Sequence, residues 1–401
     1  MEQDVSKAVP IGAGVVCALV GFTSSFAVVL AGLRAAGASP AQAASGLVAV
    51  SLAMGAASML LSWRFRMPIT SAWSTPGAAL LITTGAVAGG WPAAVGAFAV
   101  TAALLFATGL WPALARLVTR IPTAVAQAML AGVLLPLCVA PVTALAHDPG
   151  AIAPVLAVWL IVLAVRPRWA VPAAFGAALV VITVTLVREH SLPAASAWIP
   201  QLHVTAPSLT LQALTGIALP LYIVTMAAQN IPGVAVMAGF GFHVPWRPAL
   251  TVTGIGSLLA APFGGHAVNL AAISAALAAA PDADPNPRRR WIAGFTTGAM
   301  YCALGLVSTG LTAAVLAAPD GVVQAVAGVA LLSAFAGACA GAMADESARI
   351  PAAVTLVVAA SGTTVAGVGA AFWALVVGVI AHRLLRPAPN PAPETSAAPG
   401  G

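Results

Sequence analysis

Long apolar runs dominate the chain, and short polar or proline-containing breaks separate them. A membrane-spanning helix needs about 20 predominantly apolar residues, and most of the runs approach or exceed that length. We therefore predict fourteen transmembrane segments, although the ninth and thirteenth are short. They cover residues 9–33, 41–63, 67–88, 91–118, 122–145, 151–165, 169–187, 209–231, 248–261, 262–280, 291–318, 322–344, 350–361 and 365–385.

The longest polar connection, residues 188–207, divides these segments into two sets of seven. An odd number in each set places the halves in opposite orientations, which makes an inverted repeat if they share a fold. We predict an all-α polytopic membrane protein built as a 7+7 inverted repeat. Its parts are a first repeat over residues 1–188, an external loop over 189–207, a second repeat over 208–386 and a disordered cytoplasmic tail over 387–401.

The third and tenth segments are interrupted by residues that a spanning helix avoids. The third contains PITSAWSTPGAAL (68–80) and the tenth PFGGHAVNLAAISAAL (262–277). Unpaired backbone groups in lipid cost several kcal/mol, so such breaks persist only against protein or a watery cavity. We predict extended segments near 69–73 and 264–267 that cross at mid-membrane, each followed by a half-helix. Interruptions at matching places in two halves indicate the binding site of a transporter.

Composition supports this class, because 61% of the residues are hydrophobic and only 6% are charged. No soluble domain of this length stays in solution with so few charges. If both termini are cytoplasmic, all of the 16 Lys and Arg residues except Arg34 and Arg188 lie on the cytoplasmic side, as the positive-inside rule requires. The net charge of +6 lacks the clustering of a nucleic-acid surface and suits contact with an anionic lipid bilayer.

Titratable side chains are almost confined to loops and segment ends. His266 is the exception, since it lies in the break of the tenth segment. A lone histidine in an apolar helix is more often a hydrogen-bonded core residue, but the break favours a function. Its ordinary pKa of about 6.5 makes it the candidate proton carrier. Asp345 and Glu346, where the twelfth segment meets the cytoplasm, are either a solvated cluster with Arg349 or a proton exit.

Uncharged polar side chains concentrate in the two broken segments and in two others. In the first and eighth segments they are Thr23, Ser24, Ser25, Tyr222, Thr225, Gln229 and Asn230. Tyr222, Thr225 and Gln229 recur at spacings that place them on one face of a helix. Interhelical hydrogen bonds could explain any one of them, but their concentration favours a cavity.

The four cysteines fall in apolar stretches without the spacing of metal ligands, so we expect reduced packing residues. No nucleophile, base or metal-ligand cluster indicates an enzyme. We therefore expect no catalytic residues, no metal and no cofactor. A channel would need a continuous polar lining, which the last four segments supply poorly.

Three stretches resemble the benzoate/proton symporter (BenE) family. They are PITSAWSTPGAALL (68–81), TMAAQNIPGVAV (225–236) and APFGGHAVNLAAISAA (261–276), and the resemblance runs from about Gly21 to the last segment. It implies a secondary transporter in a bacterial inner membrane that imports benzoate, or a related aromatic carboxylate, with a proton by alternating access.

The chain is also similar in plan to the nucleobase permeases, whose fourteen segments form a core (1–4 and 8–11) and a gate (5–7 and 12–14). A homodimer through the gate domain is a further expectation. Those permeases carry acidic residues in the eighth and tenth segments, where this chain has Gln229, His266 and Asn269. This difference favours an anionic substrate over a uracil-like one.

Residues and resemblance together predict a site for a flat aromatic carboxylate. Half-helix N-termini near 75–77 and 267–269 would bind the carboxylate through backbone N–H groups. The candidate substrate-binding residues are Ser24, Trp73, Ser74, Thr75, Gly77, Tyr222, Gln229, Asn230, Phe263, His266 and Asn269, of which Trp73, Tyr222 and Phe263 would form the wall for the ring. Protonated His266 would neutralise the anion. Transport of another small anion or a nucleobase remains the alternative function, and an anion channel ranks third.

Overall fold

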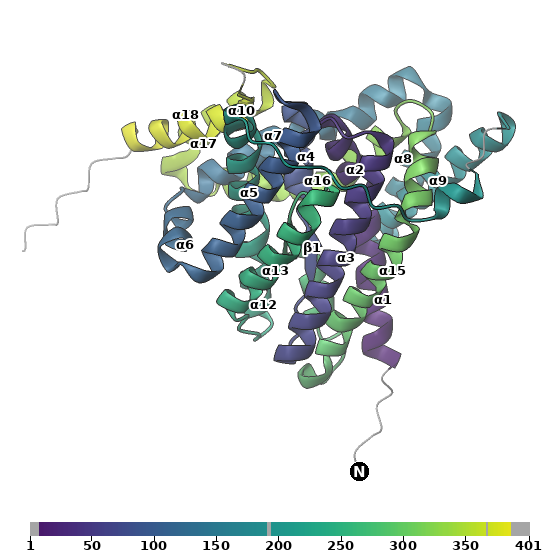
Figure 1. Cartoon of the computed structure of the whole chain (residues 1–401), viewed down its shortest axis with the longest axis horizontal. Helices are drawn as coiled ribbons and strands as arrows, with labels where there is room; N and C mark the ends of the chain where they lie inside the picture. Colours follow the sequence, from purple (N-terminus) through teal and green to yellow (C-terminus); the bar gives the residue numbers. More distant parts are fainter. Residues whose placement is uncertain (1–7, 191–193, 366–367, 386–401) are drawn as a thin grey trace, which may run out of the picture.

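Helices make up nearly all of the chain in a computed structural model that describes residues 8–190, 194–365 and 368–385 (Figure 1). Within those ranges, eight helical stretches are long and apolar enough to cross a membrane. They are Ala8–Ala35, Pro40–Phe65, Gly90–Leu110, Thr123–His147, Pro167–Arg188, Leu211–Gly239, Pro287–Leu316 and Val322–Met343. The predicted class, a helical membrane protein, is confirmed, and the predicted tail at 387–401 lies outside the described residues.

The first half of the chain contains nine α-helices in the described ranges. They are α1 (Ala8–Thr23), α2 (Phe26–Ala35), α3 (Pro40–Phe65), α4 (Thr75–Thr84), α5 (Gly90–Leu110), α6 (Pro112–Thr119), α7 (Thr123–His147), α8 (Pro149–Val165) and α9 (Ala170–Arg188). The second half also contains nine. They are α10 (Leu211–Ala213), α11 (Leu219–Thr225), α12 (Ile231–Gly239), α13 (Trp246–Ala260), α14 (Ile273–Ala279), α15 (Trp291–Leu316), α16 (Val322–Met343), α17 (Arg349–Ala360) and α18 (Ala370–Leu384).

Two groups of helices pack mainly within themselves. In the first group α3 lies along α15, α1 packs on α15, and α13 packs between α3 and α5 (Figure 1). This group also contains α2, which packs on α3 and α4, the segment α10–α12, which packs on α5, and α14, which packs on α1. In the second group α7 lies against α16 and α17, α18 packs on α17, and α8 packs on α9. Each group therefore mixes helices from both halves of the sequence.

Glycines bring α3 and α15 into backbone contact. A Cβ atom at Gly298 would lie 2.5 Å from the carbonyl oxygen of Gly55, and a Cβ atom at Gly55 would lie 2.6 Å from the carbonyl oxygen of Gly298. Neither position has room for a side chain. Small residues of this kind allow close helix packing where lipid supplies no hydrophobic driving force.

Both predicted breaks contain extended backbone, and the two breaks pair with each other. Strand β1 (Ser71–Trp73) is antiparallel to β2 (Val268–Leu270), with Ala72 opposite Asn269. Hydrogen bonds from Ser74 N–H to Ala267 O and from Ala271 N–H to Thr70 O extend the ladder at both ends. The N–H and C=O groups of one break thus form hydrogen bonds with those of the other. This pairing lets both extended segments be buried without the free-energy cost of unpaired backbone groups.

The predicted start of the second half-helix, near 267–269, is wrong. Those residues lie in and beside strand β2, and α14 begins only at Ile273. Pairing with β1 holds the backbone extended through Leu270, so the helix cannot start earlier. The extended stretch correspondingly reaches several residues beyond the predicted 264–267.

The predicted end of the eighth segment, at Ile231, is also wrong, because the helix continues through Pro232 to Gly239 as α12. Two π-helical turns, η3 (Leu214–Ala218) and η4 (Met226–Asn230), interrupt it instead. In η4 the N–H of Ile231 donates to the carbonyl of Met226, five residues back. This wider turn accommodates Pro232, which has no N–H and would clash with the preceding turn of a regular helix.

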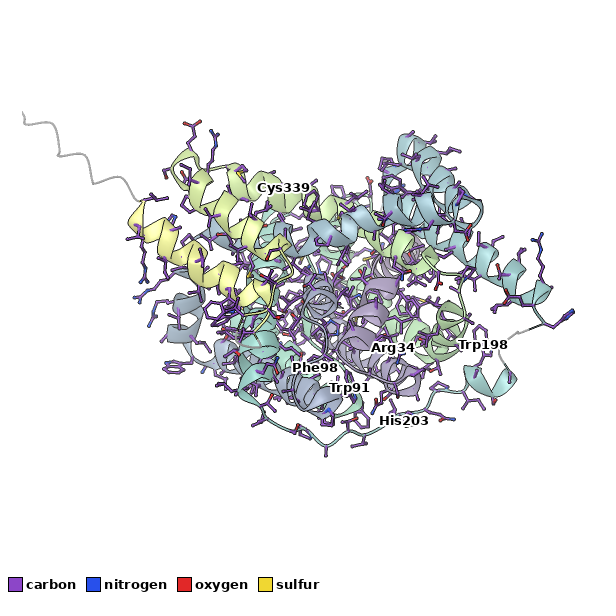
Figure 2. The ribbon with its side chains drawn as sticks, turned by 90° about the horizontal axis from the view of Figure 1, so that it is seen from above. Arg34, Trp91, Phe98, Trp198, His203 and Cys339 are labelled. Atoms are coloured by element: carbon purple, nitrogen blue, oxygen red, sulfur yellow. The ribbon has the colours of Figure 1, made fainter. Side chains whose placement is uncertain are left out.

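An extended connecting segment, residues 199–210, links α9 to α10 across the first helix group (Figure 1). Its backbone is fastened by His203 N–H to Ser45 Oγ at 2.9 Å and by Thr205 N–H to Pro262 O at 2.8 Å. The indole of Trp91 donates to Thr205 Oγ1 at 3.1 Å. Figure 2 shows Trp91 beside Phe98, with His203 of this segment nearby.

Candidate functional site

A cavity of about 200 Å³ lies between the two helix groups, next to the paired strands. From the first group it is lined by Val20, Gly21, Ser24, Ser25, Ala72, Trp73, Thr75, Pro76, Gln229, Ala271, Ala272, Ser274 and Tyr301. From the second group it is lined by Leu134, Pro167, Arg168, Val171, Pro172, Ala330, Leu331, Ser333 and Ala334. Hydroxyl groups, one amide and one guanidinium thus face a largely apolar space.

Four of the predicted site residues line this cavity, namely Ser24, Trp73, Thr75 and Gln229. The Trp73 ring is buried against Phe22, with the ring centroids 5.1 Å apart. Because Phe22 packs against the ring, Trp73 presents a fixed aromatic face to the cavity.

The start of α4 forms the polar side of the cavity. Ser74 caps this helix by accepting from the Gly77 N–H at 3.2 Å, and Thr75 Oγ1 donates to Ser25 Oγ at 2.8 Å. Since Pro76 has no N–H, Thr75 carries the one N–H of this turn that has no partner among the described residues. A Cβ atom at Gly77 would overlap the side chains of Leu221 in α11 and of Ser74, so a larger residue here would have to displace both.

His266 lies behind this turn and does not line the cavity. Its ring is fully buried, and Nε2 is 3.0 Å from the carbonyl oxygen of Ser74. A carbonyl only accepts, so Nε2 carries a proton in this arrangement. Nδ1 has no hydrogen-bond partner within the described part of the chain, and the ring meets Phe98 edge to face. Ser74 therefore separates the imidazole from the cavity.

Three other predicted side chains are buried and bonded within the protein. Asn230 Oδ1 accepts from the Leu270 N–H at 2.8 Å and so fixes strand β2. The Tyr222 hydroxyl is 2.5 Å from Thr108 Oγ1, which links α11 to α5. Asn269 Nδ2 donates to the Leu270 carbonyl, whereas its Oδ1 is buried without a partner in the described structure.

The remaining predicted residues lie away from the cavity. Phe263 lines an apolar groove between α3 and α13. Asp345 and Glu346 are exposed just before α17, where Glu346 forms an ion pair with Arg349 at 2.9 Å. Hydrogen bonds from the hydroxyl and the N–H of Ser347 lower the pKa of Asp345, so this carboxylate stays ionised at neutral pH.

Sequence reasoning missed several residues that line the cavity, chiefly Tyr301, Arg168 and Ser274. Tyr301 is one of only two tyrosines in the chain, and an amphipathic ring in an apolar helix was the available signal. Arg168 had been counted only as a loop charge. Its position in the cavity follows from the packing of α9 against α1 and α15 of the first group, which no local pattern reveals.

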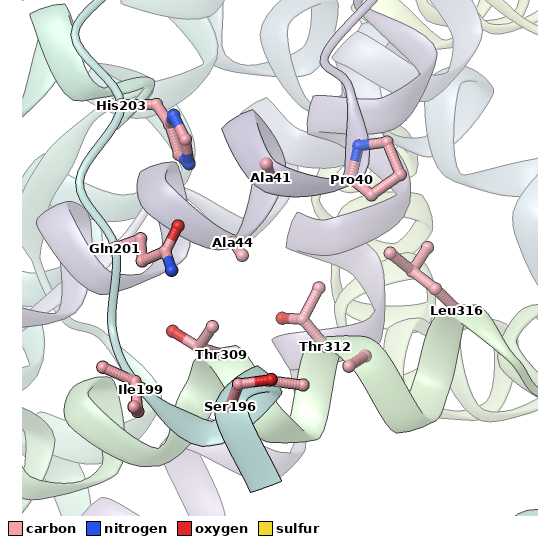
Figure 3. Close-up of a pocket in the computed structure, with 12 residues that line it drawn as sticks. Pro40, Ala41, Ala44, Ser196, Ile199, Gln201, His203, Thr309, Thr312 and Leu316 are labelled. Carbon is pink, nitrogen blue, oxygen red and sulfur yellow. The ribbon is translucent and has the colours of Figure 1, made fainter. Parts of the chain in front are cut away.

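A second cavity, of about 250 Å³, lies under the residues that precede and begin the connecting segment (Figure 3). Gln201, Thr309 and Thr312 point into it from the connecting segment and α15, and α3 closes the other side. It is lined by α3, α15 and residues 196–203, and it shares no lining residue with the cavity beside the paired strands.

Comparison with known proteins identifies the family. A family model described as the benzoate membrane transport protein, BenE, matches residues 4–384. The chain belongs to the BenE family. It is a membrane transporter, and the resemblance seen in the sequence is confirmed.

Two relatives in this family match nearly the whole chain. The inner membrane protein YdcO of Escherichia coli is 37% identical over 380 residues, covering 93% of this chain and 95% of the relative. The benzoate membrane transport protein of Acinetobacter baylyi is 29% identical over 390 residues, covering 96% and 97%. These relatives support a multi-pass inner membrane protein.

Solved transporters share the fold at low sequence identity. The transmembrane domain of the cyanobacterial bicarbonate transporter BicA superposes with a TM-score of 0.57 at 16% identity, covering 94% of this chain and 96% of that domain. The murine anion transporter Slc26a9, in its inward-facing state, gives a TM-score of 0.62 at 12% identity, covering 96% and 69%.

Proposed function

We propose that this transporter imports benzoate, or a related aromatic carboxylate, together with a proton. The observation that carries the proposal is the cavity between the helix groups. It combines a fixed aromatic face at Trp73 with hydroxyl donors at Ser24 and Thr75, and no carboxylate is among its described lining residues. Such a lining suits a flat ring that bears one negative charge. The BenE family match gives independent support.

In this proposal the substrate carboxylate lies at the start of α4. The Thr75 N–H donates to it, with the positive end of the helix dipole behind it. The hydroxyls of Ser24 and Thr75, which donate to Gly21 O and Ser25 Oγ in this structure, exchange those acceptors for the carboxylate. Gln229 supplies an amide donor, and Trp73 forms the wall for the ring. The site residues that do not line the cavity act as supports: Ser74, Gly77, Tyr222, Asn230 and Asn269 hold the strands and helices that carry the site, and Phe263 lies farther away.

His266 is the proposed proton carrier. It contacts the turn at the start of α4 through Ser74. The Ser74 carbonyl accepts from Nε2 of His266, and the Ser74 side chain caps α4. Protonation at the unpaired Nδ1 would create a positive charge behind the turn that binds the carboxylate. Anion and proton would then favour each other's binding, and this coupling is reciprocal. Asp345 and Glu346 are weaker candidates because both are exposed.

The proposed architecture is fourteen segments in a 7+7 inverted repeat, with both termini in the cytoplasm and repeats over 1–188 and 208–386. The first helix group, with β1 and β2, would be the core, and α7–α9 with α16–α18 would be the gate. Movement of one against the other would give alternating access, and the gate would also form any homodimer. The mixed origin of each group and the antiparallel strand pair support this proposal.

Uptake by purified protein in liposomes tests the function directly. With an inward proton gradient, we expect saturable accumulation of labelled benzoate that excess benzoate abolishes. Benzamide, which has the same ring without the charge, and uracil should compete poorly. Equal competition by benzamide would show that the carboxylate is not recognised, and uptake that never saturates would indicate a channel. Stronger competition by another small anion would reassign the substrate.

A further inference from the structure

One charged side chain lines the cavity among the described residues, and it comes from the second helix group. Arg168 lies in the short turn η1 (Pro167–Trp169) between α8 and α9. The aromatic, hydroxyl and amide groups of the proposed substrate site all come from the first group. Arg168 therefore faces these groups from across the boundary.

The guanidinium of Arg168 has no partner of its own in the described structure. The ion pairs among the described residues join Arg289 to Asp284 and Arg349 to Glu346, and neither involves η1. Arg168 is exposed, so it lies where the cavity meets solvent. A guanidinium offers a planar fork of donors that fits a carboxylate, and it does so with little reorganisation.

We propose that Arg168 is a specificity-determining residue that contacts the substrate carboxylate and selects for anions at the mouth of this cavity. The inference rests on the proposed function and adds a residue to it. Because Arg168 and the start of α4 belong to different helix groups, the substrate anion holds the two groups together while it is bound. A neutral ring of the same shape lacks that contact.

Arg166 provides a matched control. It is the same residue type, two positions earlier, equally exposed, and not among the residues that line the cavity. A general electrostatic attraction of anions to this end of the molecule would be reduced equally by loss of either arginine. A direct contact would be lost only with Arg168.

The experiment measures binding of benzoate and benzamide to purified full-length protein by titration calorimetry. The proteins compared are the wild type, Arg168→Gln, Arg168→Lys and Arg166→Gln. We expect Arg168→Gln to weaken benzoate binding about two- to fivefold, the range for a solvent-exposed ion pair, and to leave benzamide binding unchanged. Arg168→Lys should retain part of the preference, and Arg166→Gln all of it. The effect should shrink as salt rises, because the screening length falls from about 10 Å at 0.1 M to about 3 Å at 1 M.

Different outcomes separate this inference from the function on which it rests. Wild-type protein that binds benzamide as tightly as benzoate would overturn both. Wild-type protein that prefers benzoate, with an Arg168→Gln variant that keeps the full preference, would overturn the inference alone. Equal losses of benzoate affinity in Arg168→Gln and Arg166→Gln would also overturn the inference, since they would indicate a general electrostatic attraction of anions and not a direct contact. Thermal unfolding of each variant confirms that the proteins compared are folded.

Discussion

Ser74 joins three parts of the site through one residue. Its carbonyl accepts from His266, its hydroxyl caps α4 by accepting from Gly77, and the same hydroxyl is 2.8 Å from Thr225 Oγ1. A change at the imidazole therefore reaches the turn that faces the cavity through a single backbone unit. This arrangement makes coupling between proton and substrate testable one residue at a time.

The first prediction concerns His266. His266→Gln keeps a side chain that can donate to the Ser74 carbonyl but cannot titrate. We expect it to abolish accumulation of benzoate driven by a pH gradient, while binding persists and loses its pH dependence. Uptake into liposomes and equilibrium binding over a range of pH measure the two effects. His203→Gln, on the connecting segment, is the control and should behave as wild type. Accumulation by the His266→Gln variant under a pH gradient alone would place the proton elsewhere.

The second prediction concerns Asp345, the obvious alternative carrier. Hydrogen bonds from Ser347 lower the pKa of the Asp345 carboxyl in the folded protein. These bonds stabilise the folded state fully at pH values above the ordinary carboxyl pKa, and that stabilisation is lost as the pH falls through the lowered pKa, far from neutrality. Asp345→Asn should therefore leave the pH profile of uptake unchanged between about pH 6 and pH 8. A shifted profile in that range would show that Asp345 takes part in coupling.

At the scale of elements, the sequence predicted where helices break but not how the broken pieces pair. Proline and glycine beside Trp73 and His266 are local signals, and each break is present. The register of Ser71 opposite Leu270 joins residues far apart in the chain, so no local pattern contains it. The late start of α14 follows from that pairing, and it was missed for the same reason.

The roles of the predicted site residues were likewise predictable only where they depend on local sequence and not on the packing of distant residues. Thr75 lies beside the break of the third segment, Ser24 belongs to the polar group of the first segment, and both line the cavity. Tyr222 and Asn230 belong to the polar group of the eighth segment that suggested a cavity, yet they bond to Thr108 and Leu270. A polar side chain in an apolar helix needs a hydrogen-bond partner, and only the packing of the helices decides whether that partner is the substrate or the protein.

The third prediction tests the contact between α3 and α15. Gly298→Ala places a methyl group against the backbone of Gly55, where neither helix can yield locally. We expect a loss of about 1–3 kcal/mol in stability, the usual cost of overpacking, seen as a lower unfolding temperature in detergent. Gly337→Ala in α16 is the control, because nothing lies within 4 Å of its added Cβ. An unchanged unfolding temperature for Gly298→Ala would mean that the helices are not in backbone contact.

At the scale of the whole molecule, the cavity lies between two groups whose buried side chains also pack against each other. One such contact is edge to face between Phe26 of α2 and Phe175 of α9, with centroids 5.9 Å apart. Transport by relative movement of the groups requires this contact to slide or open. A model in which the groups stay fixed has no such requirement.

The fourth prediction uses that contact. In protein whose native cysteines are replaced, a short bifunctional reagent should cross-link Phe26→Cys to Phe175→Cys and stop uptake, while substrate binding persists. A pair within one helix, Trp291→Cys and Phe295→Cys in α15, is the control and should transport normally after cross-linking. Full uptake by the cross-linked Phe26 and Phe175 variant would show that these helices do not move apart during the cycle.

The π-helical turns of the segment from Leu211 to Gly239 have a consequence for how members of this family differ in length. Each such turn contains one residue more than an α-helical turn, so removing one residue from Leu214–Ala218 restores a regular helix. The deletion turns the wide turn into an ordinary one, so the residues on either side keep nearly their present orientation, and the strand pairing is untouched. We expect sequence alignments of BenE proteins to contain single-residue gaps inside this membrane helix, where insertions and deletions are ordinarily absent, and the residues on either side of each gap should keep their present faces.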